Sequence, residues 1–596
     1  MPQRPRQPVA VPAPAAANGG GHAGGEAREV EWQLTAPDLG VVRRWLDQHP
    51  RLERLSIEPL PAQQLHDRYL DTEDWRLFRA GFALRLREEA GRVEATLKGL
   101  FSARNDVADR REITERLSER GAKALAHATG PVGSRVRDVA GVMRLRPLFE
   151  VRTARQRFLV RNRDPDVDVG EIALDEARFT RGNGRRRPML LTRVELEAIG
   201  HDSAPLERLA NRMRTECGLS RASENKFAVG LRAASLEPPR AAAHGRDAEP
   251  PAAVMDASTR AGEFAAAALR SLHREWQANE PPARLGEGPE PLHRLRITAR
   301  RMETILSFFC ACLPAGVRKS RETLKSLLDA LGAVRDADIR LEAASSFRNS
   351  LPEADRRGLD PLLRHLQSER AQVRSRMLGA LDAQRSREWL DTLPDQLARS
   401  TSATTLASAS SRNAAALSVV PDLIRTRYRK LRKFARRLTA ESSMKEFHAV
   451  RVRAKKLRYA LELVAPTYSK PANRMLAALN KLQSRLGTQH DSDTIARYLT
   501  QLATEAPPSF TAATLFLMGR MAEVHARQAA RTGARIRGPW RKLRRRRWKA
   551  LRLRMEELRD GVAATRQPAA TAHAPRADGK LIVPTGAWAF PAATRH

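Results

Sequence analysis

Charged residues of the same sign recur two positions apart in the first third of the chain. On a β-strand, residues i and i+2 lie on one face, about 6.5–7 Å apart. Converging carboxylate pairs suit a hard divalent cation such as Mg²⁺, and facing arginines can bind phosphate oxygens through charge-assisted bonds. Together they predict metal-assisted phosphoryl transfer. The pairs are Glu29 with Glu31, Glu195 with Glu197, and Arg85 with Arg87.

The elements that must position these pairs are predicted to be strands. From Arg28 to about Ala233 the pattern has mostly a period of two, with helices predicted at 38–48 and 204–217. One interpretation is an antiparallel sheet with its polar face in water. The polar faces, however, repeat Glu-x-Glu and Arg-x-Arg instead of a Thr, Lys, Ser and Gln mixture. The alternative is a closed sheet whose charged face lines an internal tunnel.

The stretch YLDTEDWRLFRAGFALRLREEAGRVEATLKG, from Tyr69 to Gly99, resembles the centre of CYTH domains, the triphosphate tunnel metalloenzymes. The resemblance extends over residues 27–233, with the landmarks in the family's order. The opening ExExK motif falls on Glu29, Glu31 and Gln33. The later landmarks are Arg110 with Glu112, ALDEA around Asp175, the Glu195/Glu197 pair, and SENKFAVG with Lys226.

This resemblance implies a site for tripolyphosphate or a nucleoside triphosphate, with Mg²⁺ or Mn²⁺ as cofactor. The implied metal ligands are Glu29, Glu31, Glu195 and Glu197. The implied triphosphate-binding residues are Gln33, Arg85, Arg87, Lys98, Arg110, Arg155, Arg157 and Lys226. Of these residues, Glu29, Glu31, Arg85, Arg87 and Lys98 would form the catalytic set.

Position 33 departs from the family motif, because glutamine replaces its lysine. A neutral amide can still hydrogen-bond a phosphate oxygen, but it gives up a charge at the substrate. From the sequence we therefore expect Gln33→Lys to raise activity or ligand affinity. Arg193, next to the second acidic pair, is a further departure.

A basic helix occurs twice in the second half of the chain. HRLRITARRM begins at His293 and HAVRVRAKKL at His448, a separation of 448 − 293 = 155. LGAVRDADI begins at Leu331 and LGTQHDSDT at Leu486, and 486 − 331 is also 155. The constant offset predicts an internal duplication. Spacings of three, four and seven residues put the cations of each copy on one helical stripe.

The order of these helical segments resembles the CHAD domain, a duplicated bundle that accompanies CYTH in many bacterial proteins and binds polyphosphate. Basic helix faces are often just solvated surface, but such surfaces normally mix signs, and these are almost purely cationic. We expect Asp336, Asp338, Asp491 and Asp493 to pair with the cations, with a metal site as the alternative. The implied polyphosphate-binding residues are His293, Arg296, Arg300, Arg301, Arg429, Lys430, Arg432, Lys433, His448, Arg451, Lys455, Lys456 and Arg458.

The predicted fold class is α+β and multidomain. Residues 27–233 are expected to form an N-terminal antiparallel β-barrel tunnel, and 255–560 an all-α duplicated helical bundle with repeats at about 255–410 and 411–560. Residues 234–254 form a Pro/Ala-rich linker. Residues 1–26 and 561–596 have the composition of disordered segments.

The net charge of +38 requires a polyanionic partner, either nucleic acid, polyphosphate or an anionic membrane. An aromatic content of 5% argues against base-stacking platforms. No apolar run is long enough for a membrane span. Cys217, Cys310 and Cys312 are expected to be buried thiols, which fits a cytoplasmic protein, including one associated with polyphosphate granules.

Two other functions stay open. The first is a polyphosphate-granule scaffold without turnover, which Gln33 favours. The second is nonspecific nucleic-acid binding, which the net charge and the basic block Arg541–Lys549 allow. The oligomeric state does not follow from the sequence.

Overall fold

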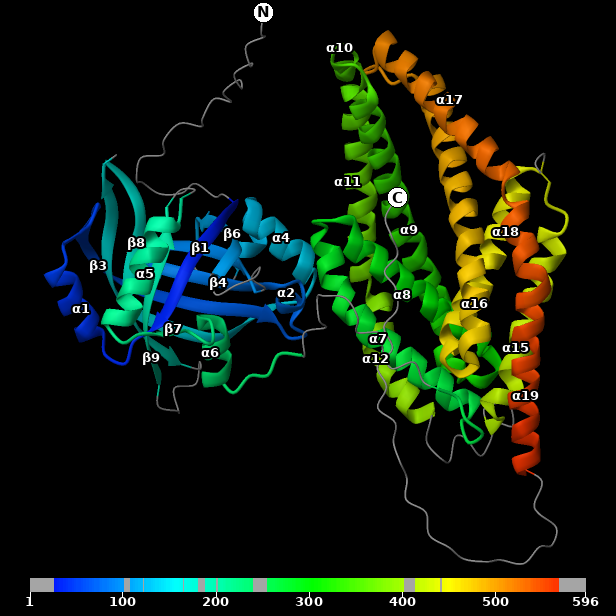
Figure 1. Cartoon of the computed structure of the whole chain (residues 1–596), viewed down its shortest axis with the longest axis horizontal. Coiled ribbons are helices and arrows are strands. Elements are labelled where there is room, and N and C mark those ends of the chain that lie inside the picture. Colours follow the sequence, from blue (N-terminus) through cyan, green and yellow to red (C-terminus); the bar gives the residue numbers. More distant parts are fainter. Residues whose placement is uncertain are drawn as a thin grey trace, which may run out of the picture.

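The chain has a sheet-containing domain followed by a helical domain (Figure 1). The computed structural model describes residues 26–239 and 254–566, apart from 90, 101–107, 120, 122, 165, 181–187, 200–201, 401–412 and 440–441. This order confirms the predicted α+β, multidomain architecture.

All strand pairs described in the first domain are antiparallel. The order of the long strands is β1-β6-β5-β4-β3-β7-β8-β9, and β9 pairs again with β1. Residues 26–31 of β1 pair with β6, and residues 31–35 pair with β9. The path of paired strands therefore returns to its start, as a barrel requires. The strands are β1 (Glu26–Thr35), β2 (Arg51–Leu52), β3 (Leu55–Thr72), β4 (Phe82–Glu89), β5 (Arg92–Gly99), β6 (Ala108–Leu117), β7 (Leu145–Arg163), β8 (Asp166–Thr180), β9 (Met189–Ala198) and β10 (Ser220–Arg221).

Helices cover the outer face of this sheet. Leu196 of β9 lies in one apolar cluster with residues of α1 (Leu39–Gln48) and α5 (Ala204–Glu216). Leu84 of β4 lies in another, under α2 (Arg76–Arg79), α3 (Ala124–His127) and α4 (Pro131–Ala140). Because side chains alternate along a strand, Glu195 and Arg85 point to the opposite, inner face, and both are buried. The interpretation of a polar sheet face in open water is therefore wrong for these strands.

One helix, α6 (Lys226–Ala233), packs against residues of that inner face. Phe227 contacts the rings of Tyr69 and Phe149, which alternate in phase with the charged inner residues of β3 and β7. Asn225 caps the helix by accepting a hydrogen bond from the Ala228 amide. This packing fixes the first residue of the helix, Lys226, beside the charged interior.

The second domain is helical throughout the part that the structure describes. Its longest helix, α16, is broken at Ser469, which has a positive φ of 49° and lies between two prolines. The elements are α7 (Ala261–Leu285), α8 (Pro289–Phe308), η1 (Cys310–Cys312), α9 (Ala315–Ser350), α10 (Glu353–Arg356), η2 (Arg357–Leu359), α11 (Asp360–Asp382), α12 (Gln384–Ser400), α15 (Ala416–Ala435), α16 (Met444–Glu505), α17 (Ala512–Ala534), α18 (Arg537–Lys542), η3 (Leu543–Arg547) and α19 (Trp548–Arg566).

The predicted duplication is visible in the helix boundaries. α16 corresponds to α8 and α9 joined across the break at Ser469. Buried residues from both repeats share one core, including Trp276, Leu295, Leu457 and Tyr468. Three pairs of boundaries repeat the sequence offset: the starts of α7 and α15 (416 − 261 = 155), the starts of α8 and α16 (444 − 289 = 155), and the ends of α9 and α16 (505 − 350 = 155).

The two domains touch through α2 and α4 on one side and α7 and α11 on the other. Glu287, in the turn after α7, pairs with Arg111 of β6 and accepts a hydrogen bond of 2.9 Å from Arg135 Nε of α4. Arg374 Nη2 of α11 lies 2.8 Å from Asp138 Oδ2 of α4. No pattern in the sequence predicted this interface.

Two smaller expectations also have outcomes. Cys217 and Cys312 are buried, but Cys310 is exposed because it begins a tight turn after α8. No helix in the described ranges combines the length and apolarity needed to cross a bilayer.

Candidate functional site

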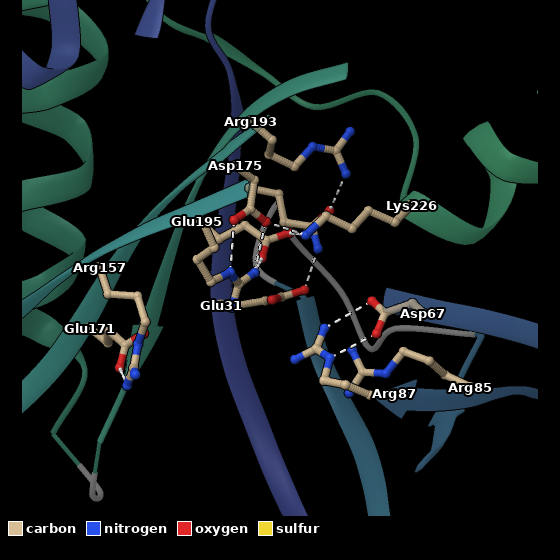
Figure 2. Close-up of polar contacts among 12 residues, drawn as sticks. Glu31, Asp67, Arg85, Arg87, Arg157, Glu171, Asp175, Arg193, Glu195 and Lys226 are labelled. Carbon is tan, nitrogen blue, oxygen red and sulfur yellow. Dashed lines mark hydrogen bonds and ion pairs between the residues drawn. The ribbon is translucent and has the colours of Figure 1, made fainter. Parts of the chain in front are cut away.

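Strand register gathers the predicted site residues in the interior of the barrel. Glu31 of β1 lies opposite Glu197 of β9, and Gln33 lies opposite Glu195. Arg155 of β7 lies opposite Asp175 of β8. The side chains converge from neighbouring strands, as Figure 2 shows for the labelled members. The pairs that were separate in the sequence therefore form one charged lining.

Two cations in this lining are held by two carboxylates. Arg155 donates two hydrogen bonds of 2.7 Å to Asp175 and one of 2.7 Å to Glu195. Lys226 Nζ lies 3.0 Å from Glu195 Oε1 and also pairs with Asp175. Burial opposes the ionisation of Glu195, but Lys226 and Arg155 outweigh it and hold the pKa well below its usual range. Glu195, predicted as a metal ligand, is thus engaged by cations that the resemblance assigns to the triphosphate.

A second set of ion pairs lies on β3, β4, β5 and β6. Arg87 donates to both oxygens of Asp67, at 2.8 and 2.9 Å. Burial would raise the pKa of Asp67, but Arg87 and Arg85 lower it well below the ordinary value. Lys98 Nζ lies 3.1 Å and Arg85 Nη2 lies 3.6 Å from Glu112 carboxylate oxygens. Arg87 and Lys98 are therefore each positioned by an acid on the adjacent strand, whereas the partner of Arg85 lies two strands away, on β6.

Three acidic residues of this network were not predicted as site residues: Asp67, Asp175 and Glu112. Asp175 and Glu112 are among the landmarks of the family resemblance, but no function was predicted for them. Asp67 lies twenty residues from Arg87, as Asp175 does from Arg155, so only the strand register reveals these partners. Alternation within β3 is the one sequence signal that would have placed Asp67 inside.

Glu31 and Glu197 lie where negative charge accumulates. Glu31 is 5% exposed and accepts a hydrogen bond from the Gln33 side-chain amide. The pKa of Glu197 is raised, first by burial and then by Glu31, Glu112 and Glu195, although Lys98 opposes the shift. A divalent cation at this point would relieve that repulsion.

The metal implied by the resemblance can be tested against these carboxylates. No group of three or more His, Cys, Asp and Glu suited to a metal occurs among the described residues. Mg²⁺, however, is usually held by one or two carboxylates together with waters and substrate phosphates. Glu31 and Glu197 meet that requirement. The side chains of Glu29 and Arg110 lie outside the described residues, although their backbones pair across β1 and β6.

Arg157 is the predicted triphosphate-binding residue that lies apart from the others. It is paired with Glu171 at 2.6 Å, away from the cluster in Figure 2. The structure thus brings together Arg85, Arg87, Lys98, Arg155 and Lys226 around Glu31, Glu195 and Glu197, and leaves Arg157 outside this group.

A second group of cations lies between the repeats of the helical domain. Burial, Arg451, Arg296 and Arg300 together lower the pKa of Lys455 to about 7, against the attraction of Asp491. Residues from α8 and α16 therefore share one electrostatic environment. Arg451 Nη2 is 3.7 Å from Asp491 Oδ1, a long ion pair.

The histidines flank this cluster. His293 and His448 are exposed residues, but partial burial of each imidazole, together with nearby cations, lowers the pKa of each. The rings of His448 and His490 lie with centroids 5.2 Å apart and are tilted by 46° to each other. Asp338 accepts a 2.6 Å bond from Arg370 of α11, a residue outside the predicted set of cations.

The remaining predicted polyphosphate-binding residues are more dispersed. Arg301 and Arg458 both lie near Glu462, at 3.8 and 3.4 Å. Lys456 is exposed on α16, and four cations are exposed on α15: Arg429, Lys430, Arg432 and Lys433. The block Arg541–Lys549 spans α18, η3 and the start of α19, with the side chains at 542, 544 and 545 outside the described residues.

Comparisons with known proteins agree with this division. A family model of the CYTH domain matches residues 41–230, and one of the CHAD domain matches residues 267–500. The CHAD domain from the plant Ricinus communis is 27% identical, with 49% of this chain and 96% of that chain covered and a TM-score of 0.41. PptA from Streptomyces chartreusis is 20% identical, with coverages of 48% and 100% and a TM-score of 0.37. A Hippeastrum protein described as an adenylyl cyclase with a dominant triphosphatase activity is 19% identical, with coverages of 35% and 98% and a TM-score of 0.27.

Proposed function

We propose that this chain, which carries a CYTH domain followed by a CHAD domain, hydrolyses a linear triphosphate in its barrel and binds inorganic polyphosphate on its helical domain. CYTH domains bind triphosphate substrates, are generally metal-dependent, and include both triphosphatases and cyclases. The proposal selects tripolyphosphate or a nucleoside triphosphate as substrate and Mg²⁺ or Mn²⁺ as the metal.

The observation that carries the hydrolase proposal is the lining of paired cations and carboxylates. Phosphoryl transfer depends mainly on positioning and on neutralising charge at the phosphate oxygens. Arg87 is fixed by Asp67, and Arg155 by Asp175, so each guanidinium is oriented before substrate arrives. Their remaining N–H groups, with Lys98, would bind the phosphate oxygens. Bound Mg²⁺ or Mn²⁺ would supply further charge neutralisation, and Glu31 and Glu197 are the residues that would hold it.

The test is phosphate release from tripolyphosphate and from ATP by the full chain, with and without Mg²⁺ or Mn²⁺. Glu31→Gln and Glu197→Gln should each abolish metal-dependent release, because each removes an anionic ligand. Glu176→Gln is the matched control: its side chain pairs with Arg178 on the outer side of β8 and should leave the rate unchanged. Absence of release by the unmodified chain would favour the scaffold without turnover, and a cyclic nucleotide product would indicate a cyclase.

The observation that supports polyphosphate binding is the cation cluster shared by α8 and α16. Burying several cations together is unfavourable without an anion, and polyphosphate is a dense one. The informative variant of the full chain combines Arg296→Ala, Arg300→Ala, Arg451→Ala and Lys455→Ala. Affinity for long-chain polyphosphate should collapse, whereas weak binding of duplex RNA should fall much less.

The same variant decides between polyphosphate and nucleic acid. Equal losses for both ligands would mean a general polyanion surface and would favour nonspecific nucleic-acid binding. Helicity measured by circular dichroism must be unchanged for the comparison to hold. With polyphosphate as the ligand, the proposal also places the protein in the cytoplasm, in association with polyphosphate granules.

A further inference from the structure

Gln33 lies between a buried arginine and a buried carboxylate. Arg193 Nη1 donates to Gln33 Oε1 at 3.1 Å, and the Gln33 amide nitrogen donates to Glu31. The two contacts agree on the orientation of the amide, with its oxygen toward the guanidinium and its nitrogen toward the carboxylate. Arg193 and Glu31 are therefore linked through one side chain.

Arg193 is itself an unusual residue for a barrel interior. It is 2% exposed, and its second terminal nitrogen donates to the Glu224 carbonyl at 2.8 Å, just before the helix that carries Lys226. A buried guanidinium is costly unless nearby anions or hydrogen bonds compensate for the lost hydration. Its charge also helps to lower the pKa of Glu195, two residues along the same strand face.

We propose that Arg193 supplies, through Gln33, the positive charge that position 33 itself lacks, so that the two residues act as one positioning unit for Glu31 and the incoming triphosphate. This inference rests on the proposed hydrolase function. It explains how a neutral residue can stand at a position facing an anionic substrate. The cation has moved to the neighbouring strand, and the amide transmits its orientation to the carboxylate.

This role of Arg193 predicts that Gln33→Lys lowers activity, whereas the sequence alone predicts that it raises activity. A lysine at position 33 would place an ammonium group next to the Arg193 guanidinium, where the amide oxygen now lies at 3.1 Å. Two like charges at that distance, away from water, repel each other. Gln33→Lys should therefore impair the site while Arg193 is present, and should be tolerated once Arg193 is neutral.

The experiment is a double-mutant cycle in the full chain with Gln33→Lys, Arg193→Gln and the double variant. Each single variant should lower kcat/KM for tripolyphosphate at least about tenfold, the effect of losing one charge-assisted contact. The double variant should return to within about threefold of the unmodified chain, because one cation is again present. Arg178→Gln, an exposed arginine of the same strand pair, is the control and should change nothing.

Calorimetric affinity for tripolyphosphate without metal provides a second readout, and it should follow the same cycle. Arg193→Lys keeps the charge and should therefore retain more affinity for tripolyphosphate than Arg193→Gln. If Arg193 acted only as a structural donor to the Glu224 carbonyl, the two variants would not need to differ in this way. If Arg193→Gln fails to fold, Gln33→Lys with Arg193→Lys replaces the double variant and should have lower affinity than either single variant.

Higher activity of Gln33→Lys with Arg193 intact, or no rescue in the cycle, would overturn the inference. If the unmodified chain binds tripolyphosphate but releases no phosphate, the hydrolase proposal fails while the affinity cycle still decides the role of Arg193.

Discussion

Replacing Lys455 by arginine should remove a pH dependence of polyphosphate binding. In the folded chain the pKa of Lys455 falls from its ordinary value of 10.5 to about 7, through burial and then through Arg451, Arg296 and Arg300, with Asp491 opposing. Half of the lysines are then neutral at pH 7. A bound polyanion brings negative charge to the cluster and should restore the ordinary pKa, so that binding takes up a proton.

The magnitude follows from linkage. The pKa of the free form lies below that of the bound form, so affinity is full below about pH 7 and is lost as the pH rises above it. Between pH 7 and pH 9 the loss is about 50-fold, or ~2.3 kcal/mol, if the bound pKa is 10.5. The loss of affinity between pH 7 and pH 9 is still about tenfold if the pKa of Lys455 in the ligand-free chain is one unit higher. In the ligand-free chain the pKa values of His448 and His490 are also lowered. These histidines therefore contribute to the pH dependence of affinity only at more acidic pH.

Isothermal titration of the full chain with long-chain polyphosphate at pH 7, 8 and 9 measures this loss. Repeating the titrations in buffers of different ionisation enthalpy gives the proton uptake, which should approach one per site at pH 8. Lys455→Arg keeps the charge without titrating in this range, so its affinity should be flat and its proton uptake absent. Arg300→Lys, at the equivalent position of the first repeat (455 − 300 = 155), is the matched comparison and should steepen the dependence. The same slope in the unmodified chain and in Lys455→Arg would refute the reasoning.

Three further predictions concern the barrel and the domain interface. Asp67→Asn removes the buried carboxylate that partners the half-buried Arg87 and should lower the free energy of unfolding by about 3 kcal/mol in a denaturant titration. The folded-state pKa values of Asp67 and Glu195 are lowered, so the stability that these carboxylates provide is present above their ordinary pKa and should be lost as the pH falls below about 4. In thermal unfolding, Asp67→Asn should lose less stability than the unmodified chain over this acid range. Glu287→Gln removes the carboxylate that Arg111 and Arg135 share. It should lower the free energy of unfolding by only about 1 kcal/mol, but it should speed the amide hydrogen exchange of residues 285–290.

The patterns that are local in the sequence predicted the fold. Alternation in Leu84–Arg87 placed the arginines inside and the leucines under helices, because the side-chain period of a strand is fixed. The helix predicted at 38–48 agrees with α1, and Asp38 caps it by accepting a hydrogen bond from the Gly40 amide. The offset of 155 predicted the repeat down to helix boundaries, because duplicated sequences keep their helix lengths.

What the sequence could not supply is the pairing across strands. Glu195 was predicted as a metal ligand from its spacing, and it pairs with Arg155 of β7 and Lys226 of α6, neither of which lies on a strand next to β9. Arg157 shares its strand face with Arg155 but pairs with Glu171, away from the cluster. Spacing fixes the face of a strand that a residue occupies, whereas register and depth along the barrel decide its neighbours.

The two repeats have diverged in a way that bears on how the helical domain responds to its ligand. Positions related by the offset carry Arg300 and Lys455, and likewise Arg335 and His490 (490 − 335 = 155). At these two pairs of positions the first repeat keeps a fixed charge, whereas the second gains charge when an anion arrives. Of these fixed charges, Arg300 lies on α8 and Arg335 on α9. Helix α8 begins two residues after Glu287, the residue that joins this domain to Arg111 of the barrel. These permanently charged positions thus belong to the repeat that is anchored to the barrel. An effect of ligand or pH on the titrating positions can reach the barrel through the packing of α16 on α8 and of α15 on α7.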